Sequence, residues 1–459
     1  GDRRRGTDVT RTLRSSRGDS RIGRREVLAL AGSLGLASLA GCLDQLPGSG
    51  PETIDGDALA DVADAEVPEV SETLPVDIEA SFVAEQRSIA ESDLDRIPAP
   101  FDSETIPNGV IRGRLNNMYD SATDSVARID EAETPYERLQ RANRARVSAH
   151  EARAGWRAID DDLTLAALRE SVPSIEGRIA SVVQRWSHVG DDPVRAIVVH
   201  EAIESEIRAA RNWLSSRNRR ERSDGTALDV ADLAEDLERA RTSVTVAAYV
   251  FDRFRADLDT TTEQRPRFEA AREELRTRLR DRQDALPPRD VDEPTSLVDR
   301  EVERTAGVTA LDDILRDARW RLEDRGNERD APSLASAALG ATETLVYLRA
   351  FETLRERIEE GDDVAVDEVA DVADLRADAV DAVETARDAD RNRLVVDAVL
   401  PRFARELRWI DDDVSRYEGD TRVDSARREA AQYVVVAETC RAVPSVSTDV
   451  AATLRGNDS

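Results

Sequence analysis

The sequence predicts an all-α fold, in which tandem antiparallel helical hairpins form one or two helical bundles on a disordered tether. Apolar residues recur at helical spacing almost without interruption after residue 108, and capping residues precede several of these stretches. The joints between the stretches are short, which favours antiparallel neighbours.

The periodicity and its breaks predict the individual helices. These cover residues 108–131, 134–160, 163–187, 193–217, 226–258, 265–284, 296–325, 332–360, 364–390, 392–417 and 420–442. Thr134 and Glu137 have the spacing of a capping box, with a proline at the first helical position. Asp192 and Asp330 stand before two further helices, each with a proline close behind.

Other residues indicate helix ends and bends. Gly361 and Gly419 each follow a predicted helix, where a left-handed residue often ends one. Pro173 and Pro401 fall inside predicted helices, and we expect kinks there because proline removes a backbone hydrogen bond. The acidic run 411–413 stands where one helix gives way to the next, and we interpret it as a cap.

Composition divides the chain into five parts. Residues 43–107 contain prolines and glycines among acids, which is typical of a tether. We expect a first helical bundle over 108–260, a second over 261–443 and a polar tail over 444–459. The arginine-rich residues 1–42 form the remaining part.

A weak repeat joins tryptophans and tyrosines. In three places a tryptophan near the end of one predicted helix is followed by a tyrosine within an apolar run of a later helix. The pairs are Trp213 with Tyr249, Trp320 with Tyr347, and Trp409 with Tyr433. We expect the two rings of each pair to pack across the joint of a hairpin.

The chain is strongly acidic. Its 459 residues carry a formal net charge of −30, with 95 Asp and Glu and no lysine. This charge argues against a nucleic-acid partner, because neutralising phosphates needs a basic surface. The excess of acids and the exclusive use of arginine resemble proteins of salt-loving archaea. The resemblance implies a surface that needs counterions to remain compact.

Residues 22–43 have the features of an export signal. Arg24 and Arg25 precede an uncharged apolar run that is too short to span a membrane and ends in Gly41 and Cys42. The arginine pair resembles a twin-arginine signal, and the small residues before the cysteine resemble the lipobox of exported lipoproteins. The resemblance implies a lipid on Cys42 that attaches the chain to the extracytoplasmic face of the cell membrane.

Several kinds of catalytic centre are excluded. Without lysine the chain cannot form a Walker phosphate loop, a Schiff base or a Ser-Lys pair. It also lacks the G-x-S-x-G, G-x-G-x-x-G and C-x-x-C motifs. We therefore predict no enzymatic activity and no cofactor. The remaining cysteine, Cys440, lies in an apolar helical stretch and is predicted to be a small buried residue.

The three histidines are the one constellation with the chemistry of a metal site. His150, His188 and His200 fall on consecutive predicted elements, and Glu204 shares a helix face with His200. Imidazoles and carboxylates that project into a helical bundle can bind metal. The alternative is that the histidines make structural hydrogen bonds. His150, His200 and Glu204 are the candidate ligands.

The arginines alternate with acids at helical spacing, which is typical of exposed, ion-paired helix faces. A dedicated anion site would need several arginines that converge in space, which spacing along the chain does not determine. The sequence thus predicts a membrane-anchored helical module that binds or scaffolds a membrane or surface protein. The alternative is a lipoprotein that binds a metal or small ligand for a transporter, using the 150–204 region.

Overall fold

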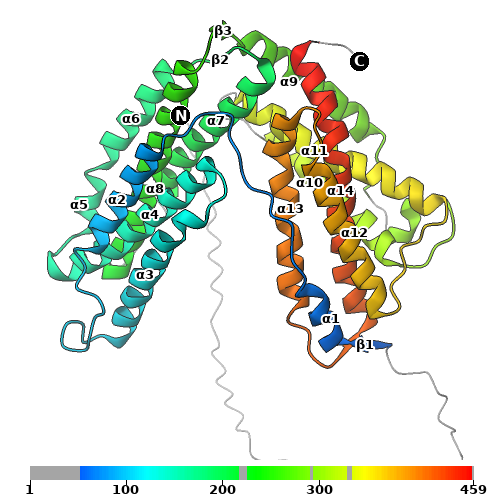
Figure 1. Cartoon of the computed structure of the whole chain (residues 1–459), viewed down its shortest axis with the longest axis horizontal. Helices are drawn as coiled ribbons and strands as arrows, with labels where there is room; N and C mark the ends of the chain where they lie inside the picture. The colour runs from blue at the N-terminus through cyan, green and yellow to red at the C-terminus, as the bar shows by residue number, and fades with distance from the viewer. Residues whose placement is uncertain (1–51, 217–224, 290–292, 328–332, 457–459) are drawn as a thin grey trace, which may run out of the picture. The chain divides into compact units, whose positions relative to one another are not determined.

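A computed structural model describes residues 52–216, 225–289, 293–327 and 333–456, and it confirms the all-α fold (Figure 1). The signal residues Arg24, Arg25 and Cys42 lie outside these ranges. Among the described residues, every helix is too short or too polar to cross a membrane.

In the first group of helices, which we call the N-terminal bundle, the long helix α8 packs against both α4 and α7 (Figure 1). The elements of this bundle are α2 (Ala80–Leu94), α3 (Gly109–Ala127), the short 3-10 helix η1 (Arg128–Glu131), α4 (Pro135–Asp160), α5 (Leu165–Arg169), α6 (Val172–Arg185), α7 (Pro193–Ser216) and α8 (Ala227–Ala256).

The second group, the C-terminal bundle, is arranged around α11 and α14. Its elements are α9 (Arg265–Asp284), the 3-10 helix η3 (Pro294–Leu297), α10 (Ala306–Asn327), α11 (Leu334–Glu359), α12 (Val369–Arg387), α13 (Arg393–Val414) and α14 (Val423–Arg455). The middle of α11 is buried on nearly all sides and is mostly apolar there. Glu343 is a buried charge in this part of the helix, and it pairs with Arg321 and Arg402.

Two antiparallel strand pairs complete the fold. β1 (Thr53–Asp55) pairs with β4 (Asp420–Arg422), and β2 (Val189–Gly190) pairs with β3 (Thr262–Glu263). The first pair holds the start of the described chain against the residues that precede α14. The short helix α1 (Gly56–Ala63) follows β1 and packs on α12 and α13.

Two of the predicted helix starts are confirmed in detail. The Thr134 hydroxyl accepts a hydrogen bond from the Glu137 amide at 3.1 Å, and Pro135 occupies the first turn of α4. The Glu137 carboxylate accepts from the Glu133 amide at 3.2 Å, one residue before the position that the predicted capping box requires. One carboxylate oxygen of Asp192 accepts from the amides of Val194 and Arg195, each at 2.9 Å. The predicted start at Asp330 lies outside the described residues.

Three prolines show where the prediction of helix bounds holds and where it fails. Pro173 lies in the first turn of α6 and so separates α5 from α6, where a kinked single helix was expected. Pro401 lies inside α13, as predicted. The polar tail predicted over 444–459 is wrong up to Arg455, because α14 continues through Pro444 and buries apolar residues on its inner face.

One glycine permits a close helix contact. A Cβ atom on Gly155 of α4 would lie 2.5 Å from a methyl carbon of Leu115 and 3.2 Å from the Cβ of Ala231. A Cβ atom here would require the Leu115 side chain to move and Ala231 to give way, so the absence of a side chain at residue 155 lets the α4 backbone lie close to α3 and α8.

The acidic run 411–413 was predicted to cap a helix, and this prediction is wrong. Asp411 lies in the last turn of α13 and is buried, where its carboxylate pairs with the Arg376 guanidinium at 2.7 and 2.9 Å. The hydroxyl of buried Tyr433 donates to the same carboxylate at 2.7 Å. This network joins α12, α13 and α14, and each charge in it has a partner, as burial requires.

The predicted Trp–Tyr packing is also wrong for two pairs. Trp320 and Trp409 are exposed by 62% and 61%, so their rings do not lie on the buried tyrosines. Tyr347 packs on Phe403 with ring centroids 5.5 Å apart. Each tryptophan falls on the outer face of its helix, a direction that its spacing to the tyrosine did not reveal.

The tether predicted over 43–107 is wrong within the described residues 52–107. This stretch forms β1, α1, α2 and a connecting segment, residues 64–79, which we call the strap. In the part of this stretch before α2, four apolar side chains are buried in the core: Ile54, Leu59, Val76 and Ile78. Ile54 and Leu59 stand among acids and glycine, and the strand-like alternation that begins at Val76 and Ile78 lasts only a few residues, so the sequence does not predict their burial.

The strap contacts both bundles through its backbone. Its carbonyl oxygens accept hydrogen bonds from four side chains: Arg376 to Ala65, Thr134 to Glu72, Arg195 to Pro75, and Arg253 to Asp77. Arg376 belongs to the C-terminal bundle and the other three donors to the N-terminal bundle. The strap therefore links the two groups of helices.

Candidate functional site

The structure separates His150 from the other two candidate metal ligands. His150 projects from α4 toward α2 and α8. Its Nδ1 lies 3.0 Å from the Asp93 carboxylate of α2, and its Nε2 lies 4.0 Å from the Glu238 carboxylate of α8. Burial disfavours the ionised form of Glu238, but the charges of His150 and Arg146 outweigh it and lower the pKa. These contacts join three helices of the N-terminal bundle.

His200 uses both ring nitrogens in structural hydrogen bonds. Its Nδ1 accepts from the Trp186 indole at 3.0 Å, which leaves the ring proton on Nε2, 2.8 Å from the Val189 carbonyl oxygen. Burial lowers the pKa of His200 to about 4, despite the opposing effect of that carbonyl. The ring is therefore neutral near pH 7.

Glu204 joins the two bundles. Its buried carboxylate lies 3.0 Å from His188 Nε2. The same carboxylate accepts hydrogen bonds from the backbone amides of Ala335 and Ser336, at 3.2 and 2.8 Å, in the first turn of α11. A carboxylate of the N-terminal bundle thus caps a helix of the C-terminal bundle, where the helix dipole favours negative charge.

His188 brings His200 and Glu204 into one cluster, since it contacts Glu204 and lies 5.1 Å from His200 between ring centroids. Within the described ranges, no group of three or more His, Cys, Asp or Glu side chains is arranged to hold a metal ion. Metal binding through His150, His200 and Glu204 stays a prediction.

Cys440 is buried, as predicted, and burial raises the pKa of its thiol.

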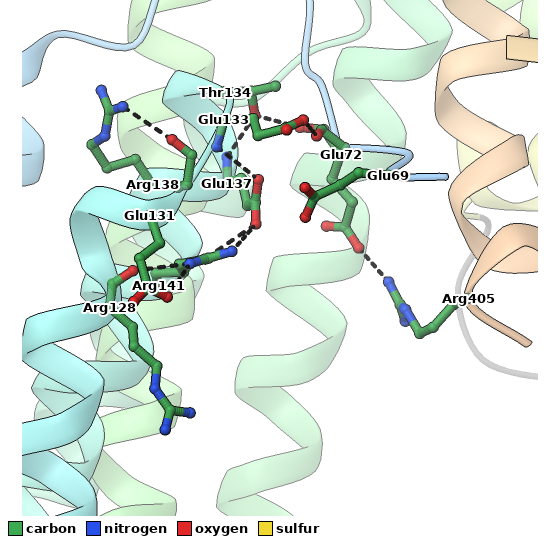
Figure 2. A network of polar contacts seen from close by, with 12 residues as sticks. Glu69, Glu72, Arg128, Glu131, Glu133, Thr134, Glu137, Arg138, Arg141 and Arg405 are labelled. Carbon is green, nitrogen blue, oxygen red and sulfur yellow. Dashed lines mark hydrogen bonds and ion pairs between the residues drawn. The ribbon is translucent and has the colours of Figure 1, made fainter. Parts of the chain in front are cut away.

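A groove of about 330 Å³ lies between the strap, α4 and α13. The strap contributes Pro68, Glu69, Val70, Ser71 and Glu72; α4 contributes Glu137, Gln140, Arg141 and Arg144; α13 contributes Pro401, Ala404, Arg405 and Arg408. Figure 2 shows Glu69 and Glu72 between Arg405 of α13 and the start of α4. This volume lies within the range of small-molecule sites.

The groove has a local excess of positive charge, with four arginines against three glutamates. Arg141 is held by Glu137 at 2.7 Å and by the Arg128 carbonyl at 2.9 Å (Figure 2). Exposed Arg144 makes no hydrogen bond or ion pair within the part of the chain that the structure describes. Several arginines thus converge, as an anion site requires.

Two ion pairs across the groove can exchange partners readily. Arg405 pairs with Glu72 at 2.6 Å and Arg408 with Glu69 at 3.6 Å, and all four side chains are 44% to 52% exposed. Pairs this exposed contribute only about 0–1 kcal/mol. An anionic ligand can therefore replace a strap glutamate at little cost in stability.

Sequence reasoning did not identify these groove residues. The arginines of α4 and α13 are far apart in the chain, and each helix alone shows the alternation of charges that an exposed face also has. A partial signal was available at 401–408, where Arg405 and Arg408 follow each other at one helical turn on the face that carries Ala404 and Pro401.

Glu204→Ala should loosen the contact between the bundles. The change removes the acceptor for the amides of Ala335 and Ser336, and we expect the free energy of unfolding to fall by about 3 kcal/mol. Hydrogen–deuterium exchange at the start of α11 should accelerate. Glu273→Ala is the control, because this side chain is 62% exposed. Unchanged exchange at residues 335 and 336 would contradict the capping role.

His200 should make stability depend on pH. Its pKa is about 4 in the folded chain against 6.5 in the unfolded one, so only the unfolded state binds its proton between these values. The free energy of unfolding should therefore fall as pH falls through this window, by up to about 3 kcal/mol. Denaturation of His200→Gln in the same buffers should show a shallower slope. Equal slopes would mean that His200 is protonated in the fold.

Two protein-family models match the chain, and neither spans half of it. No curated protein and no solved structure matches. Residues 81–260 match a family described as a domain of unknown function (DUF8262), and residues 265–452 match a second family described in the same words (DUF8264). The chain is thus similar to the first family over the N-terminal bundle and to the second over the C-terminal bundle.

Proposed function

We propose that this chain is an extracytoplasmic binding module, attached to the cell membrane by a lipid on Cys42, that holds a small organic anion in the groove. The observation that carries the binding role is the convergence of Arg144, Arg405 and Arg408 from two bundles on one cavity. The attachment rests on the signal features of residues 22–43.

The short distance along the chain from Cys42 to the folded body supports a position at the membrane. Cys42 and Glu52 are ten positions apart, so a fully extended chain between them spans at most roughly 35 Å. The strand β1 begins at Thr53 and is paired with β4. A lipid on Cys42 would therefore keep the β1–β4 end of the C-terminal bundle close to the bilayer surface.

The lining of the groove selects the class of ligand. Guanidinium groups bind carboxylates through paired hydrogen bonds. Pro68, Val70, Pro401 and Ala404 supply apolar surface beside the arginines. A small molecule with two or more carboxylates on a short carbon skeleton matches both features, and a membrane or surface protein that receives it is the partner we expect.

Replacing Arg24 and Arg25 by lysine together should block export. In the wild type, mass spectrometry of the mature chain should show an N-terminal Cys42 that carries a diacyl-type lipid, and added protease should reach the body in intact cells. The double variant should keep its signal segment and stay inside the cell, where the added protease does not reach it. Arg21→Lys, outside the pair, is the control. A mature chain with unmodified Cys42 would overturn the attachment.

Arg144→Gln and Arg405→Gln should each weaken binding of citrate, used as the probe, by roughly tenfold, because each removes one charge-assisted contact. The measurement is calorimetric titration of the full chain in detergent and molar salt. Arg276→Gln, an exposed arginine on α9 (64% exposed), should bind like the wild type. Failure of the wild type to bind citrate, or equal affinities in all variants, would remove the groove as an anion site.

A further inference from the structure

A second arginine-lined cavity lies at the β1–β4 end of the C-terminal bundle. Its volume is about 260 Å³, and its lining joins the residues before and inside α10 to the first turns of α14. The lining residues are Arg304, Thr309, Asp424, Arg427 and Arg428. It shares no lining residue with the groove between the strap, α4 and α13.

The charges of this cavity are unbalanced, with three arginines against one aspartate. Arg427 is held in place, since it pairs with Asp424 at 2.9 Å and its second nitrogen lies 3.5 Å from the Val366 carbonyl oxygen. The Asp424 side chain is 84% exposed and so only weakly compensates the arginines.

Arg304 and Arg428 are exposed, and neither makes a hydrogen bond or an ion pair to any residue that the structure describes. The chain has 95 acids for 65 basic residues, so carboxylate partners are abundant. The charge of Arg428 acts on the neighbouring Glu429 carboxylate, but its guanidinium donors are not taken by a hydrogen bond or an ion pair among the described residues. Two guanidinium groups with available donors at one cavity, beside a third that is fixed, form a set suited to a phosphate group.

The position of the cavity suggests where such a group would come from. The Val423 amide, at the start of α14, donates to the Glu52 carbonyl at 3.0 Å. Arg427 and Arg428 follow within two helical turns of that contact. They therefore lie beside the point at which the chain arrives from Cys42, which in the proposed function is anchored in the bilayer.

We infer that Arg304, Arg427 and Arg428 form a phosphate-binding site that contacts an anionic lipid headgroup at the membrane surface. This inference rests on the proposed attachment through Cys42. A lipid anchor alone restricts the distance of the body from the bilayer but leaves its orientation free. A headgroup bound in this cavity adds a second point of contact, and it turns the β1–β4 end of the C-terminal bundle toward the bilayer.

The test uses the lipidated full chain in vesicles of phosphatidylcholine, with or without phosphatidylglycerol. Phosphatidylglycerol should slow amide hydrogen exchange in peptides that cover residues 304–309 and 424–428. Arg304→Gln with Arg428→Gln should abolish the difference, whereas Arg144→Gln in the groove should retain it. Both arginines are exposed, so the double variant should fold. No difference between the two lipid compositions would overturn the headgroup as the ligand.

A second measurement separates a headgroup from free phosphate. Inorganic phosphate is titrated into the full chain in detergent, and the double variant should need roughly tenfold more for half-saturation, because charge-assisted contacts are lost. Phosphate binding without a lipid effect would support the site with a soluble phosphate as its ligand. Absence of both effects would overturn the inference, while lipid on Cys42 would still support the proposed attachment.

Discussion

The contact between the two bundles depends on the buried carboxylate of Glu204. A charge removed from water is stable only where partners replace its hydration, and Glu204 has three: His188 and the amides of Ala335 and Ser336. Two of these partners belong to α11 in the C-terminal bundle. His188 compensates part of the desolvation of Glu204 within the N-terminal bundle, and the rest is compensated only when α7 and α11 are in contact. This residue therefore favours the docked arrangement of the bundles.

The groove is a consequence of that docking. Its arginines come from α4 in one bundle and α13 in the other, and its third wall is the strap. Because strap carbonyls accept hydrogen bonds from Thr134 on one side and Arg376 on the other, the wall is held by both bundles. A change that loosens the α7–α11 contact should thus also alter the groove, although Glu204 does not line it.

The helices were predictable because their signals are local. Apolar spacing and the caps at Thr134 and Asp192 act within one or two turns, and the observed helices agree with them. Contacts between segments that lie far apart in the chain leave no such pattern in the sequence. The strap was missed because its buried Val76 and Ile78 alternate over only a few residues beside prolines and acids. The exposure of Trp409 depends on how α13 is rotated in the bundle. The groove arginines meet only after both bundles have packed.

Position at a cavity distinguishes some of the arginines that make no ion pair. In a chain with 65 basic and 95 acidic residues, an arginine on a helix surface usually has a carboxylate within reach at helical spacing, as Arg239 has in Glu235. Arg144, Arg304 and Arg428 make no such ion pair among the described residues, and neither do other exposed arginines such as those at 267, 280 and 391. What distinguishes the first three is that they line cavities. High salt weakens long-range attraction but leaves contacts inside a cavity largely intact. In this strongly acidic chain, an anion site would therefore depend on arginines that converge at a cavity when the helices pack.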